Sequence, residues 1–149
     1  MDFVDINGVN LAYRETGSGY PLVLAHEFAG SMENWDQQVN YFARKYRVIV
    51  YNARGYTPSD VPENPDVYNH KQQVADLKGL LDHLSIEKAH IGGLSMGAYT
   101  TIRFGLTHPE MCSSLIVAGA GSGSEDVEKF HQNSSKYADL MESGGMEAM

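Results

Sequence analysis

The run Gly93-Leu94-Ser95-Met96-Gly97 is a G-x-S-x-G pattern at the predicted junction of a strand and a helix. The apolar run Ala89-His90-Ile91-Gly92 before it has the length of a buried strand, and residues 96–107 after it predict a helix that ends before Pro109. A serine at such a junction lies on a sharp turn, and the flanking glycines let the backbone bend and the helix pack closely. The helix N-terminus presents N–H groups that can bind a developing oxyanion. We therefore predict that Ser95 is a catalytic nucleophile; the alternative is an ordinary glycine-lined turn.

Length and composition are those of a globular domain. The chain has 149 residues, of which 42% are hydrophobic and 20% charged. Its formal net charge of −8 argues against nucleic acid and against an anionic membrane surface as partners. Cys112 is the single cysteine, so no internal disulfide can form, and we expect a buried, unreactive thiol in a reducing compartment. The sequence shows neither a signal-peptide pattern nor an apolar run that could span a bilayer, so we expect a cytoplasmic protein.

Strand-like and helix-like segments alternate along the chain. Residues 2–6 and 9–16 predict two strands joined by a hairpin turn at Asn7-Gly8. Further strands are expected at 21–25, 47–51 and 115–118, with helices near 35–46, at 70–84 and at 127–141, and a long loop at 52–69. This order predicts an α/β fold: a mostly parallel sheet with helices on both faces, preceded by an antiparallel hairpin.

Three segments resemble the α/β-hydrolase fold family and occur in the family's order. Leu24-Ala25-His26-Glu27-Phe28-Ala29-Gly30-Ser31 stands where the family has a histidine–glycine oxyanion loop. Asn52-Ala53-Arg54-Gly55-Tyr56-Thr57-Pro58-Ser59-Asp60 stands where it usually has D-x-R-G-x-G-x-S, and the serine turn comes third. The pairing of H-E-F-A-G with N-A-R-G-Y is similar to a bacterial branch of the family. The resemblance implies that the backbone N–H groups of Phe28 and Met96 form an oxyanion hole.

Three positions in two segments depart from the family pattern. Glu27 replaces the usual glycine after the histidine, and Asn52 replaces the usual aspartate, with Thr57 at a usual glycine. An ionised carboxylate that pointed at the oxyanion would oppose the charge that develops there. We therefore expect the Glu27 side chain to point away, as a solvated or hydrogen-bonded loop residue.

A serine hydroxyl becomes an effective nucleophile when a histidine takes its proton and a carboxylate orients that histidine. The resemblance implies the chain order serine, acid, histidine, and only His108 and His131 follow Ser95. His108 ends the helix that Ser95 begins, about 20 Å away at 1.5 Å per residue. His131 lies in a tail helix that resembles the start of the family's lid. We identify no triad histidine in this chain.

The acid of a triad is not found either. Glu125 and Asp126 follow the last predicted strand, but Ser122 and Glu125 have capping-box spacing, so we expect helix-start carboxylates. The earlier histidines show no metal-ligand spacing, and His26 resembles the structural histidine of the family's oxyanion loop. The spacing of the histidines therefore gives no reason to expect a metal. No G-x-G-x-x-G pattern follows a predicted strand, so we expect no cofactor either.

These patterns predict that residues 1–123 form the N-terminal part of a hydrolase core and that 124–149 begin a lid helix, as in a fragment of a longer protein. Residues 115–118 have the composition of a strand buried on both faces, yet they would form the edge of the sheet. An apolar edge favours self-association or pairing with another chain.

Two functions fit the sequence. The first is a serine hydrolase that acts on a small ester, lactone or related carbonyl compound, with Ser95 as nucleophile. The second is an inactive, hydrolase-like module that binds a small molecule, with Arg54 and Tyr56 as candidate ligand contacts. For Arg54 the alternative is a structural arginine that bonds to neighbouring carbonyls.

Overall fold

The computed structural model describes residues 1–121 and 126–145. Its strands are β1 (Asp2–Ile6), β2 (Val9–Thr16), β3 (Tyr20–Ala25), β4 (Tyr46–Tyr51), β5 (Ala89–Leu94) and β6 (Cys112–Ala118). Its α-helices are α1 (Asp36–Phe42), α2 (His70–His83), α3 (Met96–Thr107) and α4 (Val127–Gly144), with short 3-10 turns η1 (Met32–Trp35), η2 (Pro65–Val67) and η3 (Pro109–Met111). The predicted helix near 35–46 is shorter than expected, and the last strand begins three residues earlier.

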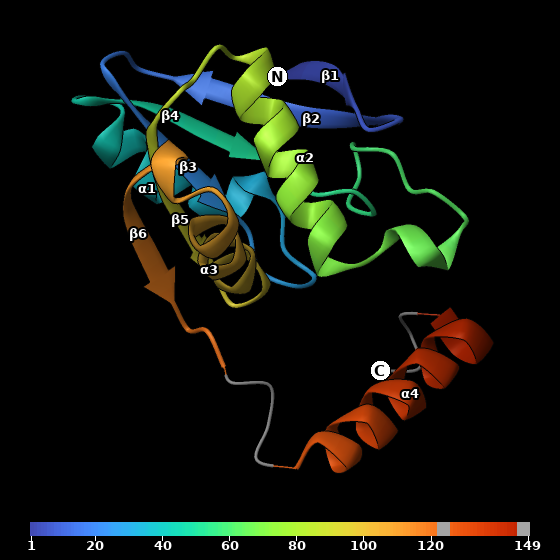
Figure 1. Cartoon of the computed structure of the whole chain (residues 1–149). Coiled ribbons are helices and arrows are strands. Elements are labelled where there is room, and N and C mark those ends of the chain that lie inside the picture. Colours follow the sequence, from blue (N-terminus) through green and yellow to red (C-terminus); the bar gives the residue numbers. More distant parts are fainter. Residues whose placement is uncertain (122–125, 146–149) are drawn as a thin grey trace.

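The described strands form one twisted sheet in the order β1-β2-β4-β3-β5-β6 (Figure 1). β3 pairs in parallel with both β4 and β5, β6 pairs in parallel with β5, and the β1–β2 hairpin joins β4 in the antiparallel sense. The chain leaves β3 towards one side for β4 and reaches the other side for β5. The strand order therefore reverses at β3, and ligands of open α/β sheets bind beyond the carboxyl ends of the strands at such a point.

The two faces of the sheet are covered by different helices, as the sequence predicted. Alternate residues of β3 point to opposite faces. Val23 and Ala25 belong to the core cluster that includes the α2 residues Leu77 and Leu80. Leu22 belongs to the second cluster with residues of β4 and α1, among them Val39. Burial of each such side chain stabilises the fold by about 1.5–3 kcal/mol, so neither face can lose its helix without a large cost.

The hairpin turn has the conformation that its sequence predicts. Asn7 and Gly8 have φ angles of 53° and 77°, which is the pair of positive values that a two-residue type I′ turn requires. The Asn7 side chain also donates to Asp76 of α2 at 3.0 Å. The turn therefore sets the register of the first two strands and ties them to a helix on the sheet face.

β6 is the edge strand that the sequence predicted, although its composition is typical of a strand buried on both faces. Leu115, Ile116 and Val117 of β6 are 41%, 47% and 44% exposed. β6 lies at the edge, paired with β5, and within the described residues no second strand covers its outer side. The apolar composition is thus that of a central strand in an edge position. Self-association through this edge stays a prediction.

α4 is set apart from the sheet at the end of the described chain (Figure 1). Phe130 and Tyr137 are more than half exposed, and Met141 is half-buried. The boundary expected between 123 and 124 lies outside the described residues, so the division into core and lid stays a prediction. No helix in the described part of the chain combines the length and apolar character needed to cross a bilayer.

α3 approaches the end of β3 at backbone contact distance. A methyl group on Gly97 would overlap the carbonyl oxygens of Ala25 and His26, and one on Gly93 would overlap the backbone of Gly97. None of these atoms can move without moving a strand or a helix. The two glycines of the G-x-S-x-G run are therefore required by the fold itself.

We predict that Gly97→Ala lowers the free energy of unfolding by about 2–3 kcal/mol, because the added methyl group forces α3 off β3. The matched control is Gly105→Ala on the same helix, where the added methyl meets the movable side-chain end of Leu115. Both changes bring the same gain in helix propensity, about 1 kcal/mol. Urea denaturation followed by circular dichroism measures both variants. Equal stabilities of the two would contradict a rigid contact at Gly97.

Candidate active site

Ser95 lies between β5 and α3 in a strained backbone conformation. Its φ and ψ are 51° and −109°, values that a residue with a side chain rarely adopts and that cost about 1–3 kcal/mol. The turn is held on both sides: the Ser95 N–H donates to the Ala118 carbonyl at 2.9 Å, and the Tyr99 N–H donates to the Ser95 carbonyl at 3.0 Å. A serine in this position usually caps its helix, but the Ser95 side chain forms no capping bond. The hydroxyl is instead exposed, on a turn held beyond the carboxyl end of β5.

The predicted oxyanion donors belong to two segments that meet beside this turn. Met96 is the first residue of α3, so its N–H has no partner within the helix. Phe28 lies in the loop after β3, and its side chain is 69% exposed. Both residues line one cavity of about 380 Å³ together with Tyr56 and Gln73. The two segments that the sequence assigned to one site thus border a common space.

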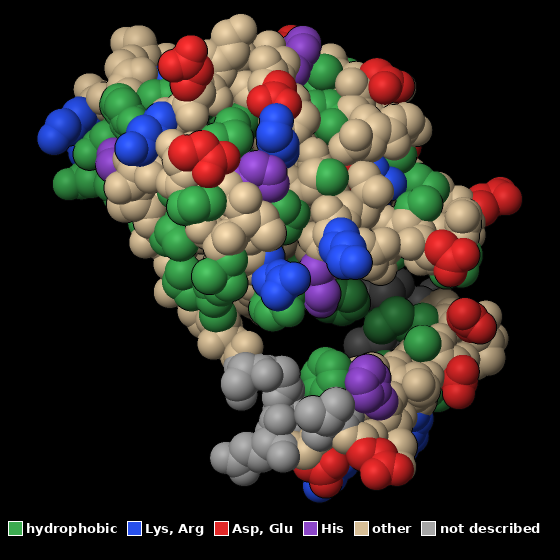
Figure 2. Space-filling model, viewed as in Figure 1, with side chains coloured by type: hydrophobic (Ala, Val, Ile, Leu, Met, Phe, Trp, Pro, Cys, Tyr) green, Lys and Arg blue, Asp and Glu red, His purple; other side chains and the backbone are tan. Residues whose placement is uncertain are grey.

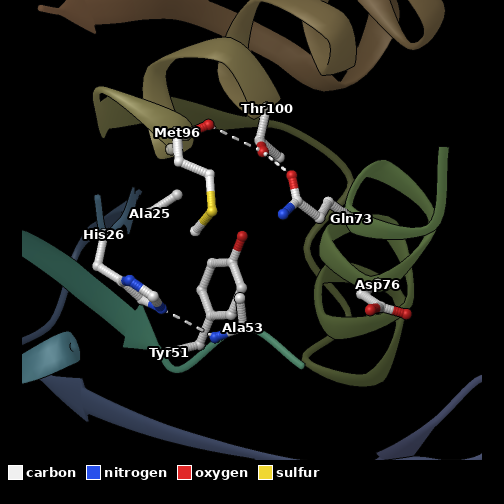
Figure 3. Close-up of a pocket in the computed structure, with 9 residues that line it drawn as sticks. Ala25, His26, Tyr51, Ala53, Gln73, Asp76, Met96 and Thr100 are labelled. Carbon is white, nitrogen blue, oxygen red and sulfur yellow. Dashed lines mark hydrogen bonds between the residues drawn. The ribbon is translucent and has the colours of Figure 1, made fainter. Parts of the chain in front are cut away.

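His26 anchors the loop after β3. Its Nδ1–H donates to the Glu27 carbonyl at 2.7 Å, and its Nε2 accepts from the Ala53 N–H at 3.0 Å. These bonds require the neutral ring with its proton on Nδ1. Burial lowers the pKa of His26, which favours the same neutral form. Figure 3 shows the ring bonded to Ala53 and close to Met96. Both ring nitrogens are occupied, so His26 holds the loops in place and is not a base for Ser95.

Glu27 is a hydrogen-bonded loop residue, as expected. Its carboxylate accepts a hydrogen bond from the Asn34 side chain in η1. The same carboxylate lies where a side chain on Gly30 would begin. The residue therefore folds back over its own loop, and its charge is directed towards η1.

Asn52 explains the second departure from the family pattern. Its Oδ1 accepts from the Met32 N–H at 2.7 Å, and its Nδ2 donates to the Thr57 carbonyl at 2.6 Å. The side chain is fully buried. An aspartate could accept the first bond but could not donate the second. The amide therefore joins the loop after β3 to the loop after β4.

The structure gives Arg54 a role that the sequence did not predict. Its Nε and one terminal nitrogen donate to the two carboxylate oxygens of Asp76 at 2.6 and 2.7 Å. Both side chains are almost completely buried, with exposures of 3% and 2%. The guanidinium therefore bonds to Asp76 and not to neighbouring carbonyls, and it is not open to a ligand. Arg54 borders the cavity, but its charge is neutralised by α2.

Tyr56 is the loop residue that reaches the candidate site. Its hydroxyl donates to Met96 Sδ at 3.6 Å, and its ring packs edge-on against His26 at 4.6 Å between centroids. Burial raises the pKa of Tyr56, and a hydrogen bond with the backbone of Ala29 offsets part of that rise. The protonated hydroxyl thus lies between the oxyanion loop and the start of α3. The sequence suggested Tyr56 as a ligand contact, and its position beside Met96 fits that suggestion.

Phe28 lines two cavities. One is the cavity of about 380 Å³, which is also lined by Tyr68, Asn69 and His70. The other, of about 290 Å³, lies between Phe28 and the α4 residues Tyr137, Ala138 and Met141. Beneath the loop, Gln73 and Thr100 enclose a space of about 10 Å³, at the lower limit for one water molecule (Figure 3).

The described structure joins no histidine to Ser95. His108 caps the far end of α3 and stacks on Phe104. His131 is exposed on α4. Asp126 accepts from the Lys129 N–H at 2.9 Å as the N-cap of α4, which is the helix-start role expected for it; Ser122 and Glu125 lie outside the described residues. Nor do three or more potential metal-binding side chains cluster anywhere in 1–121 and 126–145.

The chain is similar to known hydrolases over most of its length. The sequence model of the alpha/beta hydrolase fold family matches residues 20–145. 3-Oxoadipate enol-lactonase 2 of Acinetobacter baylyi is 36% identical over 68% of this chain, and epoxide hydrolase 3 of Siraitia grosvenorii is 32% identical over 76%. The structure of a thermophilic esterase from Thermogutta terrifontis has a TM-score of 0.88 at 29% identity and covers 97% of this chain.

These relatives are longer proteins. The matched region is 37% of the lactonase, 36% of the epoxide hydrolase and 55% of the esterase. The family match over residues 20–145 includes the serine turn and the loop after β3, and each relative has further sequence outside its match.

We predict that Asp76→Asn lowers the free energy of unfolding by about 3–5 kcal/mol, because it leaves the Arg54 charge buried without its counter-ion. The control is Asp82→Asn on the same helix, where the partner Lys78 is bonded at 2.6 Å but both side chains are about half exposed. That change should cost about 0.5 kcal/mol or less. Urea denaturation measures both. An Asp76→Asn variant as stable as the control would contradict a tightly paired Arg54.

Proposed function

This chain belongs to the α/β-hydrolase fold family, and we propose that it bears the nucleophile and oxyanion hole of a serine hydrolase. The proposed substrates are small esters, lactones or related carbonyl compounds. The single observation that supports this most directly is the strained, uncapped Ser95 on the turn between β5 and α3. A serine that served only as the N-cap of a helix would adopt an extended conformation, and its side chain would accept a hydrogen bond from an N–H group of the first turn.

The proposed reaction begins with attack of Ser95 Oγ on the substrate carbonyl carbon while a base takes the hydroxyl proton. The carbonyl oxygen becomes an oxyanion that accepts hydrogen bonds from the N–H groups of Phe28 and Met96. Loss of one such donor typically costs about 3–4 kcal/mol of transition-state stabilisation. Collapse of this tetrahedral intermediate expels the alcohol, which takes the proton from the base, and leaves an acyl-enzyme. Water then attacks the acyl-enzyme by the same steps and releases the acid.

The proposed serine nucleophile favours a carbonyl compound as the substrate. The relatives by name include an enol-lactonase, an epoxide hydrolase and an esterase. A serine hydroxyl beside two backbone donors is suited to a tetrahedral intermediate, in which negative charge develops on one oxygen. We propose that the cavity of about 380 Å³ between Phe28, Tyr56 and Met96 receives the polar part of the substrate. The cavity of about 290 Å³ beside α4, lined by Tyr137 and Met141, would receive an apolar part.

A second candidate function is small-molecule binding without turnover. The observation that favours it is the absence, within the described residues, of any histidine that hydrogen bonds to Ser95. In that case the same cavities would hold a ligand, and Ser95 would remain unreactive. The two functions differ in whether a base reaches the hydroxyl, which is a measurable property.

We predict that a fluorophosphonate probe labels the folded chain at Ser95, because the reagent reacts with activated serine hydroxyls at an oxyanion hole. Intact-protein mass spectrometry measures the adduct, and Ser95→Ala should remove it completely. Ser31→Ala, in the loop after β3, is the matched control and should leave labelling intact. Circular dichroism of each sample shows that the protein is folded.

Each outcome selects one function. Labelling that Ser95→Ala abolishes supports the hydrolase and shows that a base reaches Ser95, from a second chain or from a histidine that moves to it. A folded chain that the probe does not label favours the binding function for this chain. Labelling that persists in Ser95→Ala would overturn Ser95 as the nucleophile.

A further inference from the structure

A groove with basic walls runs between α2 and α3, and at Asn69 and His70 it adjoins the cavity of about 380 Å³ that Phe28 lines. It consists of two adjoining cavities of about 480 and 230 Å³, which share His70, Lys71 and Arg103. Lys78 and His108 line its far part. We call this feature the α2–α3 groove. Ser95 is not among the residues that line it.

The charges of the α2–α3 groove are opposite to those of the whole chain. The protein has a formal net charge of −8, yet the lining of both cavities includes no aspartate or glutamate. Its basic side chains are those of Lys71, Lys78, Arg103, His70 and His108. Figure 2 shows blue and purple side chains gathered over α2 and α3 on the face towards the viewer.

Two of these cations have no counter-ion within residues 1–121 and 126–145. Lys78 forms an ion pair with Asp82 at 2.6 Å on the helix surface. Lys71 and Arg103, in contrast, form no ion pair with any carboxylate in the described part of the chain. Lys71 of α2 and Arg103 of α3 each line both cavities, so two positive charges face the same groove. Two positive charges that face the same cavity repel each other. An anion bound between them would be attracted to both.

The groove also has the form of a ligand site. The α2 residue Val74 is buried and contributes to its lining, as does the exposed Ala75. At its other end the His70 ring packs against Tyr99 at 4.3 Å between centroids. The groove is thus concave, with apolar surface between cationic side chains. Arginine can bind a planar carboxylate or a phosphate through two parallel N–H bonds, and lysine adds a movable point charge.

We propose that the α2–α3 groove binds a small multivalent anion that carries phosphate or carboxylate groups. The volumes suit a metabolite, since small-molecule sites commonly measure about 300–1,000 Å³. A long polyanion is disfavoured because it would extend over the acidic remainder of the surface. The anion binds without reacting and without contacting Ser95, and because Asn69 and His70 also line the cavity of about 380 Å³, it would lie next to the proposed substrate cavity.

The test is a titration of the ¹⁵N-labelled full chain with pyrophosphate and, separately, with citrate at low ionic strength. The expected result is a saturable shift of backbone amide resonances in α2 and α3 around Lys71 and Arg103. Saturation by pyrophosphate alone identifies a phosphate ligand, and saturation by citrate alone identifies a carboxylate ligand; either result supports the site.

Variants decide whether the groove itself is responsible. Lys71→Gln and Arg103→Gln should each weaken binding about 3-fold, and the double variant about 10-fold. Lys45→Gln removes the same charge from the segment before β4 and should leave the affinity unchanged, as should Ser95→Ala. The spectra themselves report whether each variant is folded. Absence of a saturable shift with both anions, or an equal loss in Lys45→Gln, would overturn the proposal.

Discussion

The contact between Gly97 and the backbone at the end of β3 is the constraint on which the candidate site depends. Because no side-chain atom separates α3 from Ala25 and His26, the helix begins immediately beside the loop that follows β3. Met96 at the start of α3 and Phe28 in that loop line one cavity, and Ser95 lies on a turn with a positive φ. A helix held even one methyl group further away would separate the nucleophile from the loop that is proposed to bind its oxyanion.

Buried polar groups hold the surrounding loops in place. His26 joins the loops after β3 and β4, Asn52 repeats that connection from the other side, and Arg54 ties the second loop to Asp76 of α2. Loops that close over a sheet end bury backbone N–H and carbonyl groups, which must find partners. Each of these side chains supplies such partners. The departures at Glu27 and Asn52 fit this network, because both residues form hydrogen bonds within it.

Much of this arrangement could be predicted from the order of residue types. The Asn7-Gly8 turn, the strand–turn–helix around Ser95 and the helices on both faces follow from local preferences and from the spacing of apolar residues. The partner of Arg54 could not be predicted, since Asp76 lies 22 residues away on a different element. The edge position of β6 could be predicted from the order of elements, and Leu115, Ile116 and Val117 are exposed there because burial requires a neighbouring strand that the described residues do not supply.

The sequence by itself determined the fold class, the position of the serine turn and the positive-φ hairpin turn at Asn7-Gly8. These properties depend on short-range sterics and on periodicity, which a linear pattern expresses directly. Only the tertiary structure decided that Tyr56 lies beside Met96, that Arg54 is neutralised by α2, and that Lys71 and Arg103 face one groove. The physical reason is that charge pairing and concavity arise between elements, and their distances are set by how the helices pack on the sheet.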